Sequence, residues 1–257
     1  MSSNTSRRAF LKSSALAGLA AEPLLVAAPV PMPEPRAEKG LVFLFQGDSI
    51  TDGNRGRTTD PNHIMGHGYA FSIASRIGAD FPESGFSFYN RGISGNTVTD
   101  LQKRWSVDTL ALKPDVLSLL VGINDTDLVV NKPAEATSLE QFESTYRGLL
   151  TDSRNQHAAC LFVLGLPFVY PVGQRSENWE RWRDDTAQRQ GIVRKLAAEF
   201  NAILVDYPAL FDKALTKAPI DYWIWDGIHP TVFAHELMAR EWIKQVSSQL
   251  TFLKKYR

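Results

Sequence analysis

Five short apolar runs alternate with segments of helix length along most of the chain. The runs are nearly continuous in Val, Leu, Ile and Phe, and they occupy residues 41–46, 86–90, 116–121, 161–166 and 203–206. Strands of this composition are covered on both faces, as in a parallel sheet. The alternation therefore predicts an α/β fold in which helices connect parallel strands and cover the sheet.

Helices are expected between and after the strands, at about 69–77, 98–111, 139–155, 182–200 and 232–250. Ser138 with Gln141 gives a capping-box signal at the start of the third helix. We expect a three-layer α/β/α sandwich around a five-stranded parallel sheet of flavodoxin-like order. No linker rich in Pro or Gly divides the region, so residues 39–257 are expected to form one domain.

Charge and cysteine content exclude several classes of function. The chain has 257 residues with 28 Lys and Arg against 28 Asp and Glu, so it offers no excess positive field for nucleic acid. The single cysteine, Cys160, excludes an internal disulfide and a site with several cysteine ligands. No run of about 18 uncharged apolar residues is present, so we expect no membrane span in the mature protein.

The N-terminus carries the features of an export signal. Arg7 and Arg8 precede Phe-Leu-Lys and a weakly apolar stretch, and every second residue from Pro29 to Pro35 is proline. This order resembles a twin-arginine signal, and an amphipathic N-terminal helix is the alternative. We therefore expect residues 1–38 to be an export signal with a proline-rich linker, and the mature protein to be periplasmic or secreted.

Unusual polar residues follow four of the expected elements. Ligands of parallel sheets bind outside the carboxyl ends of the strands, so these residues are expected to share one edge. Each segment alone also fits an ordinary turn or helix cap. The segments are residues 46–53, 90–97, 122–125 and 226–230.

The residue types in these segments indicate acyl-transfer chemistry. A turn at Ser49 exposes a hydroxyl at the end of the first strand, and Asn124 offers an amide donor that stays neutral at every relevant pH. Asp226 precedes His229 by three residues and can accept a hydrogen bond from one ring nitrogen, which leaves the other free as a base. Glycines around Gly95 let the backbone approach a ligand.

Together and in this order, the four segments resemble the SGNH hydrolases, the GDSL esterase family, over about residues 41–235. Ile50 stands where the family name has Leu, which is a conservative change. The resemblance implies a serine ester hydrolase whose catalytic residues are Ser49, His229 and Asp226. It also implies oxyanion donors at the Ser49 amide, the Gly95 amide and the Asn124 side chain.

Further matches are similar to bacterial acetylxylan and xylooligosaccharide acetylesterases; they lie at residues 92–98, 113–115 and 122–125 and at Asp100, Leu101, Arg104 and Trp105. They imply a small acyl group, acetyl, on a carbohydrate such as xylan or its oligomers. A lysophospholipase or thioesterase with a longer acyl pocket is one alternative. A catalytically silent carbohydrate-binding protein on the same fold is another.

Five further side chains near these segments are candidates for substrate contact. The aromatic ones can provide flat surfaces for a sugar ring, although core packing is the competing interpretation. The candidates are Asp48, Phe168, Tyr170, Trp223 and Trp225.

A metal or cofactor is not expected. His63 and His67 are four residues apart, which on a helix would place two ligands on one face, but Pro61 and Gly66 favour a loop. No third ligand is evident, and the oligomeric state is not predicted.

Overall fold

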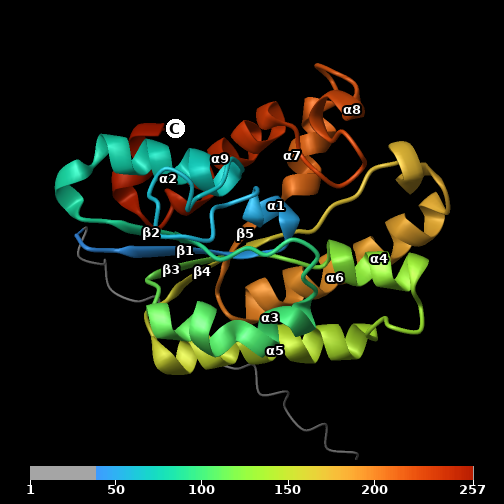
Figure 1. Ribbon diagram of the computed structural model, residues 1–257, viewed down its shortest axis with the longest axis horizontal. Helices are drawn as coiled ribbons and strands as arrows, with labels where there is room; N and C mark the ends of the chain where they lie inside the picture. The colour runs from blue at the N-terminus through green and yellow to red at the C-terminus, as the bar shows by residue number, and fades with distance from the viewer. Residues whose placement is uncertain (1–38, 257) are drawn as a thin grey trace, which may run out of the picture. The chain divides into compact units, whose positions relative to one another are not determined.

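The computed structural model describes residues 39–256, and the expected export signal and linker over residues 1–38 lie outside them. A sheet of five parallel strands has the order β2-β1-β3-β4-β5, which is the flavodoxin-like order (Figure 1). The expected fold class is thereby confirmed. The strands are β1 (Val42–Gly47), β2 (Ser87–Asn90), β3 (Val116–Leu120), β4 (Leu161–Gly165) and β5 (Ile203–Val205).

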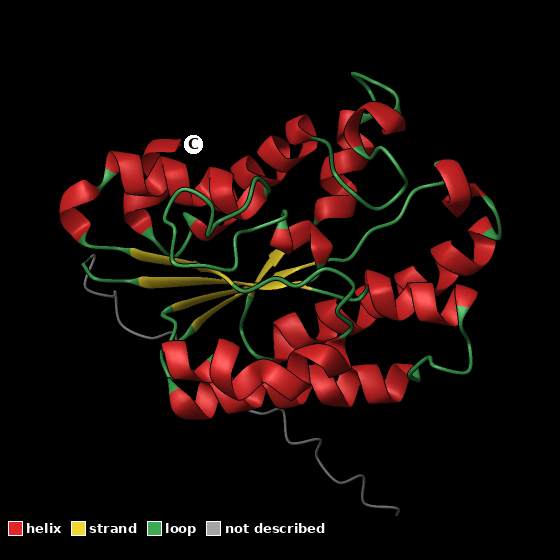
Figure 2. Ribbon diagram, in the orientation of Figure 1, coloured by secondary structure: helices red, strands yellow, loops and turns green. Residues whose placement is uncertain are grey.

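Helices cover both faces of the sheet (Figure 2). One face carries α2 (Tyr69–Asp80), α7 (Tyr207–Ala214) and α9 (Val232–Val246). The other carries α3 (Val98–Asp108), α5 (Leu139–Gln156) and α6 (Trp179–Glu199).

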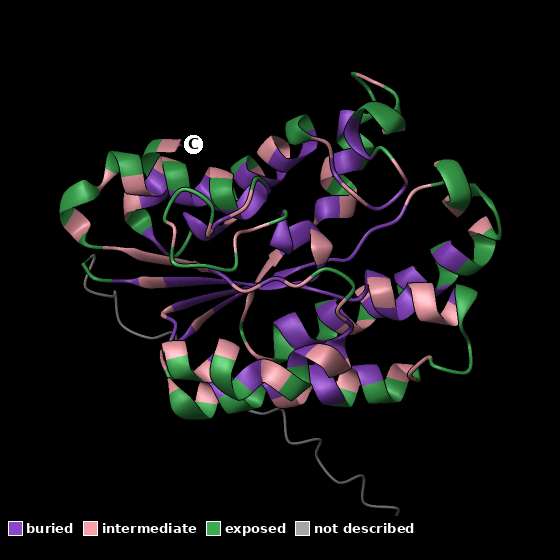
Figure 3. Cartoon of the chain, viewed as in Figure 1, coloured by how far each residue is buried: buried purple, intermediate pink, exposed green. Residues whose placement is uncertain are grey.

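Each face of the sheet has its own hydrophobic core, and the strands between them are largely buried (Figure 3). Phe43 and Phe45 of β1 point to the core beneath α9, whereas Leu44 belongs to the opposite core. Trp242 of α9 packs on Phe45, and its indole N–H donates to Ser118 Oγ at 3.0 Å. This buried hydroxyl fixes where α9 lies on the sheet, because the indole needs a partner.

Several short helices were not predicted from the sequence. They are α1 (Ser49–Asp52), α4 (Ile123–Asn131) and α8 (Ile220–Trp223), together with α7. α4 begins directly after Gly122, which has a φ of 132° and lies two residues beyond the end of β3, and its first polar residues resemble those of a loop. The last expected helix ends at Val246, four residues earlier than predicted, and turns follow it.

Ser138 caps α5 as its sequence signal indicates, because its hydroxyl accepts a hydrogen bond from the Gln141 amide at 3.2 Å. Among residues 39–256, no helix has both the length and the apolar character needed to cross a membrane.

Candidate active site

The first strand ends at Gly47, where the backbone passes so close to β3 that only glycine fits. A Cβ atom on Gly47 would lie 2.2 Å from the Leu120 carbonyl oxygen, so the backbone of β1 passes against β3 there. The Asp48 carboxylate caps α1 by accepting a hydrogen bond from the Ile50 amide at 3.0 Å. Ser49 is the first residue of this helix, and its hydroxyl lies at the carboxyl edge of the sheet.

The side chains of Ser49 and His229 meet although 180 residues separate them. Ser49 Oγ lies 2.8 Å from His229 Nε2, and His229 Nδ1 lies 2.7 Å from Asp226 Oδ2. The three side chains therefore form one continuous chain of hydrogen bonds. This is the arrangement in which an imidazole can take the proton of a serine hydroxyl.

Asp226 is held by the backbone of its own loop. Its Oδ1 accepts hydrogen bonds from the amides of Ile228, at 3.1 Å, and His229, at 2.8 Å. Burial opposes ionisation, but the hydrogen bonds from His229 and Ile228 outweigh it and lower the pKa of Asp226 to about 2. The carboxylate is therefore ionised at any working pH and accepts from His229 without taking its proton.

The loop that carries the histidine closes on itself. Ile224 and Pro230 form an antiparallel bridge, and the Trp225 amide donates to the His229 carbonyl at 3.2 Å. The Tyr170 amide donates to the Gly227 carbonyl at 2.8 Å, which joins the loop to the segment after β4.

Three N–H donors lie in the segments that follow β1, β2 and β3. In the described part of the chain, the backbone amides of Ser49 and Gly95 donate to no protein acceptor. Asn124, the second residue of α4, donates one side-chain N–H to the Asn96 carbonyl at 3.1 Å, which fixes the orientation of its amide. Free amides beside a serine hydroxyl can stabilise negative charge that develops on a substrate oxygen.

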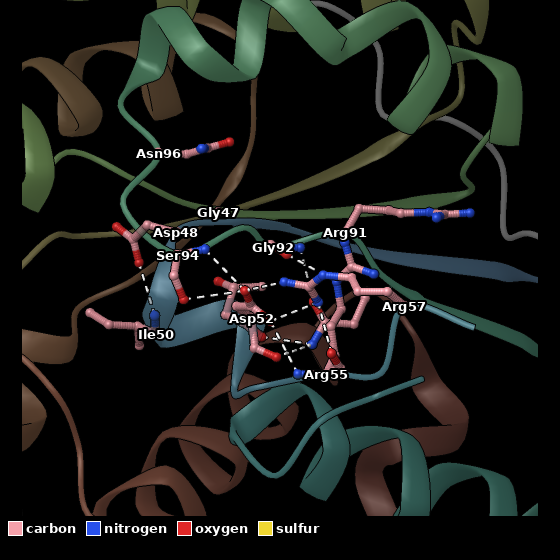
Figure 4. A network of polar contacts seen from close by, with 12 residues as sticks. Gly47, Asp48, Ile50, Asp52, Arg55, Arg57, Arg91, Gly92, Ser94 and Asn96 are labelled. Atoms are coloured by element: carbon pink, nitrogen blue, oxygen red, sulfur yellow. Dashed lines mark hydrogen bonds and ion pairs between the residues drawn. The ribbon is translucent and has the colours of Figure 1, made fainter. Parts of the chain in front are cut away.

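A buried carboxylate ties the nucleophile helix to the segment after β2 (Figure 4). Asp52 accepts from both terminal nitrogens of Arg57, at 3.0 and 2.6 Å, and from the Ser94 amide at 3.0 Å. Burial raises the pKa of Asp52, but these partners outweigh it and the net shift is downward. Asp52 therefore holds Ser49 and Gly95 in a fixed relation through their neighbours.

Asn90 also joins the nucleophile helix to the segment after β2. Its side-chain amide nitrogen donates to three carbonyls, those of Thr51 at 2.7 Å, Asp52 at 3.2 Å and Met65 at 3.0 Å. Its oxygen accepts from the Gly92 amide at 3.0 Å. Sequence reasoning missed the roles of Asp52 and Asn90, although both lie in segments that it singled out.

The expected substrate contacts of Asp48, Phe168 and Trp223 are not supported, because all three residues are buried. Asp48 is 1% exposed and caps α1. Phe168 packs against the ring of Phe211 at 5.0 Å between centroids. Trp223 donates its N–H to the Ala218 carbonyl at 3.3 Å, so both aromatic side chains serve the core.

Trp225 and Tyr170 are placed differently. The side chain of Trp225 is exposed, and its ring lies 6.3 Å from that of His229 at an angle of 23°. Tyr170 is half-buried, and its hydroxyl donates to the Pro208 carbonyl at 3.3 Å. Trp225 is therefore the expected contact residue that lies open beside the imidazole.

The two histidines considered as metal ligands lie in a turn. His63 pairs with Asp60 at 2.7 Å, and both side chains are exposed. No group of three or more His, Cys, Asp or Glu side chains suited to a metal ion occurs in residues 39–256.

Comparison with known proteins identifies the family. The family model of the GDSL-like lipase/acylhydrolases matches residues 45–237. An acetylxylan esterase of Geobacillus stearothermophilus is 34% identical over 213 residues, which cover 80% of this chain and 94% of the relative.

Two solved structures are similar over most of the chain. A protein described as a GDSL-like lipase, from Parabacteroides merdae, has a TM-score of 0.78 and 36% identity, covering 86% of this chain and 100% of the other. The acetylxylan esterase Axe2 of Geobacillus stearothermophilus has a TM-score of 0.71 and 32% identity, covering 81% and 94%. The chain therefore belongs to the GDSL-like lipase/acylhydrolase family and is a carboxylic ester hydrolase.

Proposed function

We propose that the protein is a carbohydrate acetylesterase that uses Ser49, His229 and Asp226 in a two-step acyl-enzyme mechanism. The observation that carries this proposal is the hydrogen-bond chain from Ser49 Oγ through His229 to Asp226, with links of 2.8 and 2.7 Å. A serine hydroxyl is a poor nucleophile unless a base accepts its proton during attack.

In the first step, Ser49 Oγ forms a bond to the ester carbonyl carbon while its proton moves to His229 Nε2. The tetrahedral intermediate collapses when the bond to the sugar oxygen breaks and His229 returns the proton to that oxygen. In the second step, water loses a proton to His229 and attacks the acyl-serine. Acetate leaves, and Ser49 recovers its proton. Asp226 stabilises the imidazolium in both steps because it stays ionised.

The amides of Ser49 and Gly95 and the side chain of Asn124 are the proposed oxyanion donors. The two backbone amides have no acceptor within the described residues, so they need break no existing bond to bind the oxyanion. Asn124 keeps one N–H for the Asn96 carbonyl and has a second one available. A donor of this kind typically contributes about 3 kcal/mol of transition-state stabilisation.

The proposed substrate class is acetylated xylan or xylo-oligosaccharides. Two observations support it: the relatives carry the name acetylxylan esterase, and Trp225 offers an exposed ring beside the imidazole. The flat face of an indole suits the C–H face of a sugar ring.

Rates of acetate release from acetylated xylo-oligosaccharides, glucomannan and pectin test the substrate class, and we expect the xylo-oligosaccharides to react fastest. A series of p-nitrophenyl acetate, butyrate and decanoate separates this proposal from a lysophospholipase or thioesterase, because preference for decanoate would contradict it. A serine-directed organophosphonate is expected to label Ser49. If Ser49 stays unlabelled, the mechanism is wrong.

We also propose that the protein is exported by the twin-arginine route to the periplasm or beyond. The support is the sequence around Arg7 and Arg8. Replacement of both residues by lysine is expected to leave the protein in the cytoplasm, as fractionation of cells would show. Unchanged export of this variant would contradict the proposal.

A further inference from the structure

A cavity lies at the edge of the sheet formed by β2, next to the turn that follows the nucleophile helix α1. Its volume is about 240 Å³, and it is lined by the turn after α1 and by the end of β2. Three arginines from these two segments reach it: Arg55, Arg57 and Arg91. In Figure 4 they lie to the right of Asp52, whereas Ser94 and Asp48 lie to its left.

The arginines of this cavity exceed the carboxylates available to them. Asp52 is already engaged by the paired nitrogens of Arg57 and by Ser94. The next carboxylate, Asp108, is paired with Arg104 at 3.0 Å. Arg55 is attracted by Asp52 and Asp108 from a distance, but among residues 39–256 neither Arg55 nor Arg91 forms a direct ion pair with a carboxylate.

Donors of both arginines remain unused. The Nε–H of Arg55 donates to the Gly92 carbonyl at 2.9 Å, and the terminal nitrogens of Arg55 have no acceptor within residues 39–256. Arg91 Nε is buried and has no hydrogen-bond partner in that range. A buried donor without a partner costs free energy, which a bound acceptor would recover.

Burial is the main cause that lowers the pKa of Arg55 to about 10; the charges of Arg57 and Arg91 lower it further, and those of Asp52 and Asp108 oppose the shift. The group stays charged at neutral pH, where the other two arginines repel it. An anion in the cavity would relieve this repulsion. Guanidinium groups in particular suit the two oxygens of a carboxylate.

Part of the remaining wall of the cavity is apolar. Ile64, Phe88 and Tyr89 line it, and the guanidinium of Arg91 lies 6.0 Å from the centre of the Tyr89 ring. Aromatic rings beside charged donors match a ligand that carries both C–H surface and a carboxylate. A free inorganic anion would use the arginines but not this wall.

We propose that this arginine cavity binds the carboxylate of a uronic acid unit carried by the acetylated saccharide. The inference deepens the proposed function and rests on it, because it assigns an acidic branch to the substrate of the same site. Asp52 lies three residues, or about 4.5 Å, along α1 from Ser49 and pairs with Arg57, which lines the cavity. The cavity therefore adjoins the segment that carries the nucleophile, and the inference requires neighbouring units of one oligosaccharide to occupy both places.

The test compares two acetylated xylo-oligosaccharides that are matched in length and acetyl content, one with a uronic acid branch and one without. We expect kcat/KM for the acidic substrate to exceed that for the neutral one by about tenfold, the effect of one charge-assisted contact. This ratio is expected to fall towards one as sodium chloride rises from about 20 mM to about 0.5 M. A ratio of one at low salt would overturn the inference.

Two variants at one position sharpen the test. Arg91→Gln is expected to remove most of the preference for the acidic substrate, and Arg91→Lys to retain part of it, because the charge remains but the planar fork is lost. The control Arg194→Gln removes an exposed arginine at the opposite edge of the sheet, where it pairs with Asp206, and is expected to keep the full ratio. Loss of the ratio in this control would contradict the inference.

Direct binding separates failure of the cavity from failure of the proposed function. Calorimetry with free glucuronate is expected to show binding to the wild type that is about tenfold weaker in Arg91→Gln. Hydrolysis of the neutral substrate without glucuronate binding would overturn the cavity and leave the esterase proposal standing. Glucuronate binding without hydrolysis of either substrate would support the cavity and contradict the esterase proposal. Binding of inorganic phosphate but not glucuronate would show an anion site that is not selective for sugars, and the inference would be wrong.

Discussion

The two halves of the candidate active site are built in different ways. The nucleophile half joins the ends of β1, β2 and β3: the buried side chains of Asp52 and Asn90 hold the first two together, and Asn124 joins the third through the Asn96 carbonyl. The base half is one loop between Ile224 and Pro230, in which Asp226 accepts hydrogen bonds from the loop's own amides.

The nucleophile half is therefore positioned by contacts among several segments, whereas the base half is one short loop. The position of Ser49 depends on contacts between segments that are distant in sequence, whereas the closest hydrogen bonds that orient His229 come from its own loop, which Tyr170 anchors at Gly227. Changes that support the nucleophile half are therefore expected to alter stability and activity together. Changes in the base half are expected to alter activity alone.

The largest effect is expected from Ser49→Ala, which removes the nucleophile without disturbing the partners of Asp52. Activity on p-nitrophenyl acetate should fall by about 10⁵-fold or more while the melting temperature stays unchanged. His229→Ala should be equally inactive, because the two side chains act as one unit. A residual rate above a hundredth of wild type would break the assignment of the nucleophile.

Asp226→Asn is expected to reduce kcat by about 10⁴-fold, less than His229→Ala, because it disturbs only the orientation and charge of the base. Thermal unfolding should change little, since the amide oxygen can still accept from Ile228. A large loss of stability would show that Asp226 supports parts of the fold beyond its own loop.

Asn124→Ala is expected to lower kcat by about 100- to 1000-fold, the usual effect of one oxyanion donor. KM should change little, and the circular dichroism spectrum should match that of the wild type. Wild-type turnover in this variant would remove Asn124 from the proposed oxyanion hole.

Asp52→Ala is expected to lower stability by about 3 kcal/mol, because it removes a buried carboxylate that accepts hydrogen bonds from the Ser94 amide and from Arg57. Activity should fall by about tenfold through displacement of the nucleophile helix. The matched control is Asp60→Ala, which removes an exposed carboxylate and should change neither quantity. Equal effects in both variants would remove the contrast between the two halves.

The smallest effect concerns pH and Asp48. Burial raises the pKa of Asp48 to about 7 from an ordinary value of 3.8, so the folded protein binds a proton that the unfolded chain releases. This contribution to stability is fully present below about pH 4 and is lost as pH rises through 7. Asp48→Asn should therefore reduce the decline in melting temperature between pH 5 and pH 8. An unchanged decline would show that another group causes it.

Much of the fold was predictable because its signals are local. Continuous apolar runs identify buried parallel strands, and the residues at their ends identify the edge where Ser49, Asn124 and His229 lie. The helix α4 was missed because residues 124–127 at its start are all polar and resemble a loop.

Supporting contacts could not be predicted, because they join segments whose separation in space the sequence does not give. Asn90 reaches the Met65 carbonyl, 25 residues away, and nothing near either residue indicates that pairing. The same reason explains the errors for Phe168 and Trp223. An aromatic residue beside a catalytic segment can point to the core or to the site, and only the tertiary structure decides.

Gly47 limits how the sequence of such an enzyme can change during evolution. A Cβ atom at this position would lie 2.2 Å from the backbone carbonyl oxygen of Leu120. A backbone atom cannot move aside as the end of a flexible side chain can, so no substitution of Gly47 is accommodated by a small local shift. Among descendants of this chain, the loops that meet the substrate are free to drift, and new specificities can arise in them. The residue just before the serine turn is expected to stay glycine in every active lineage.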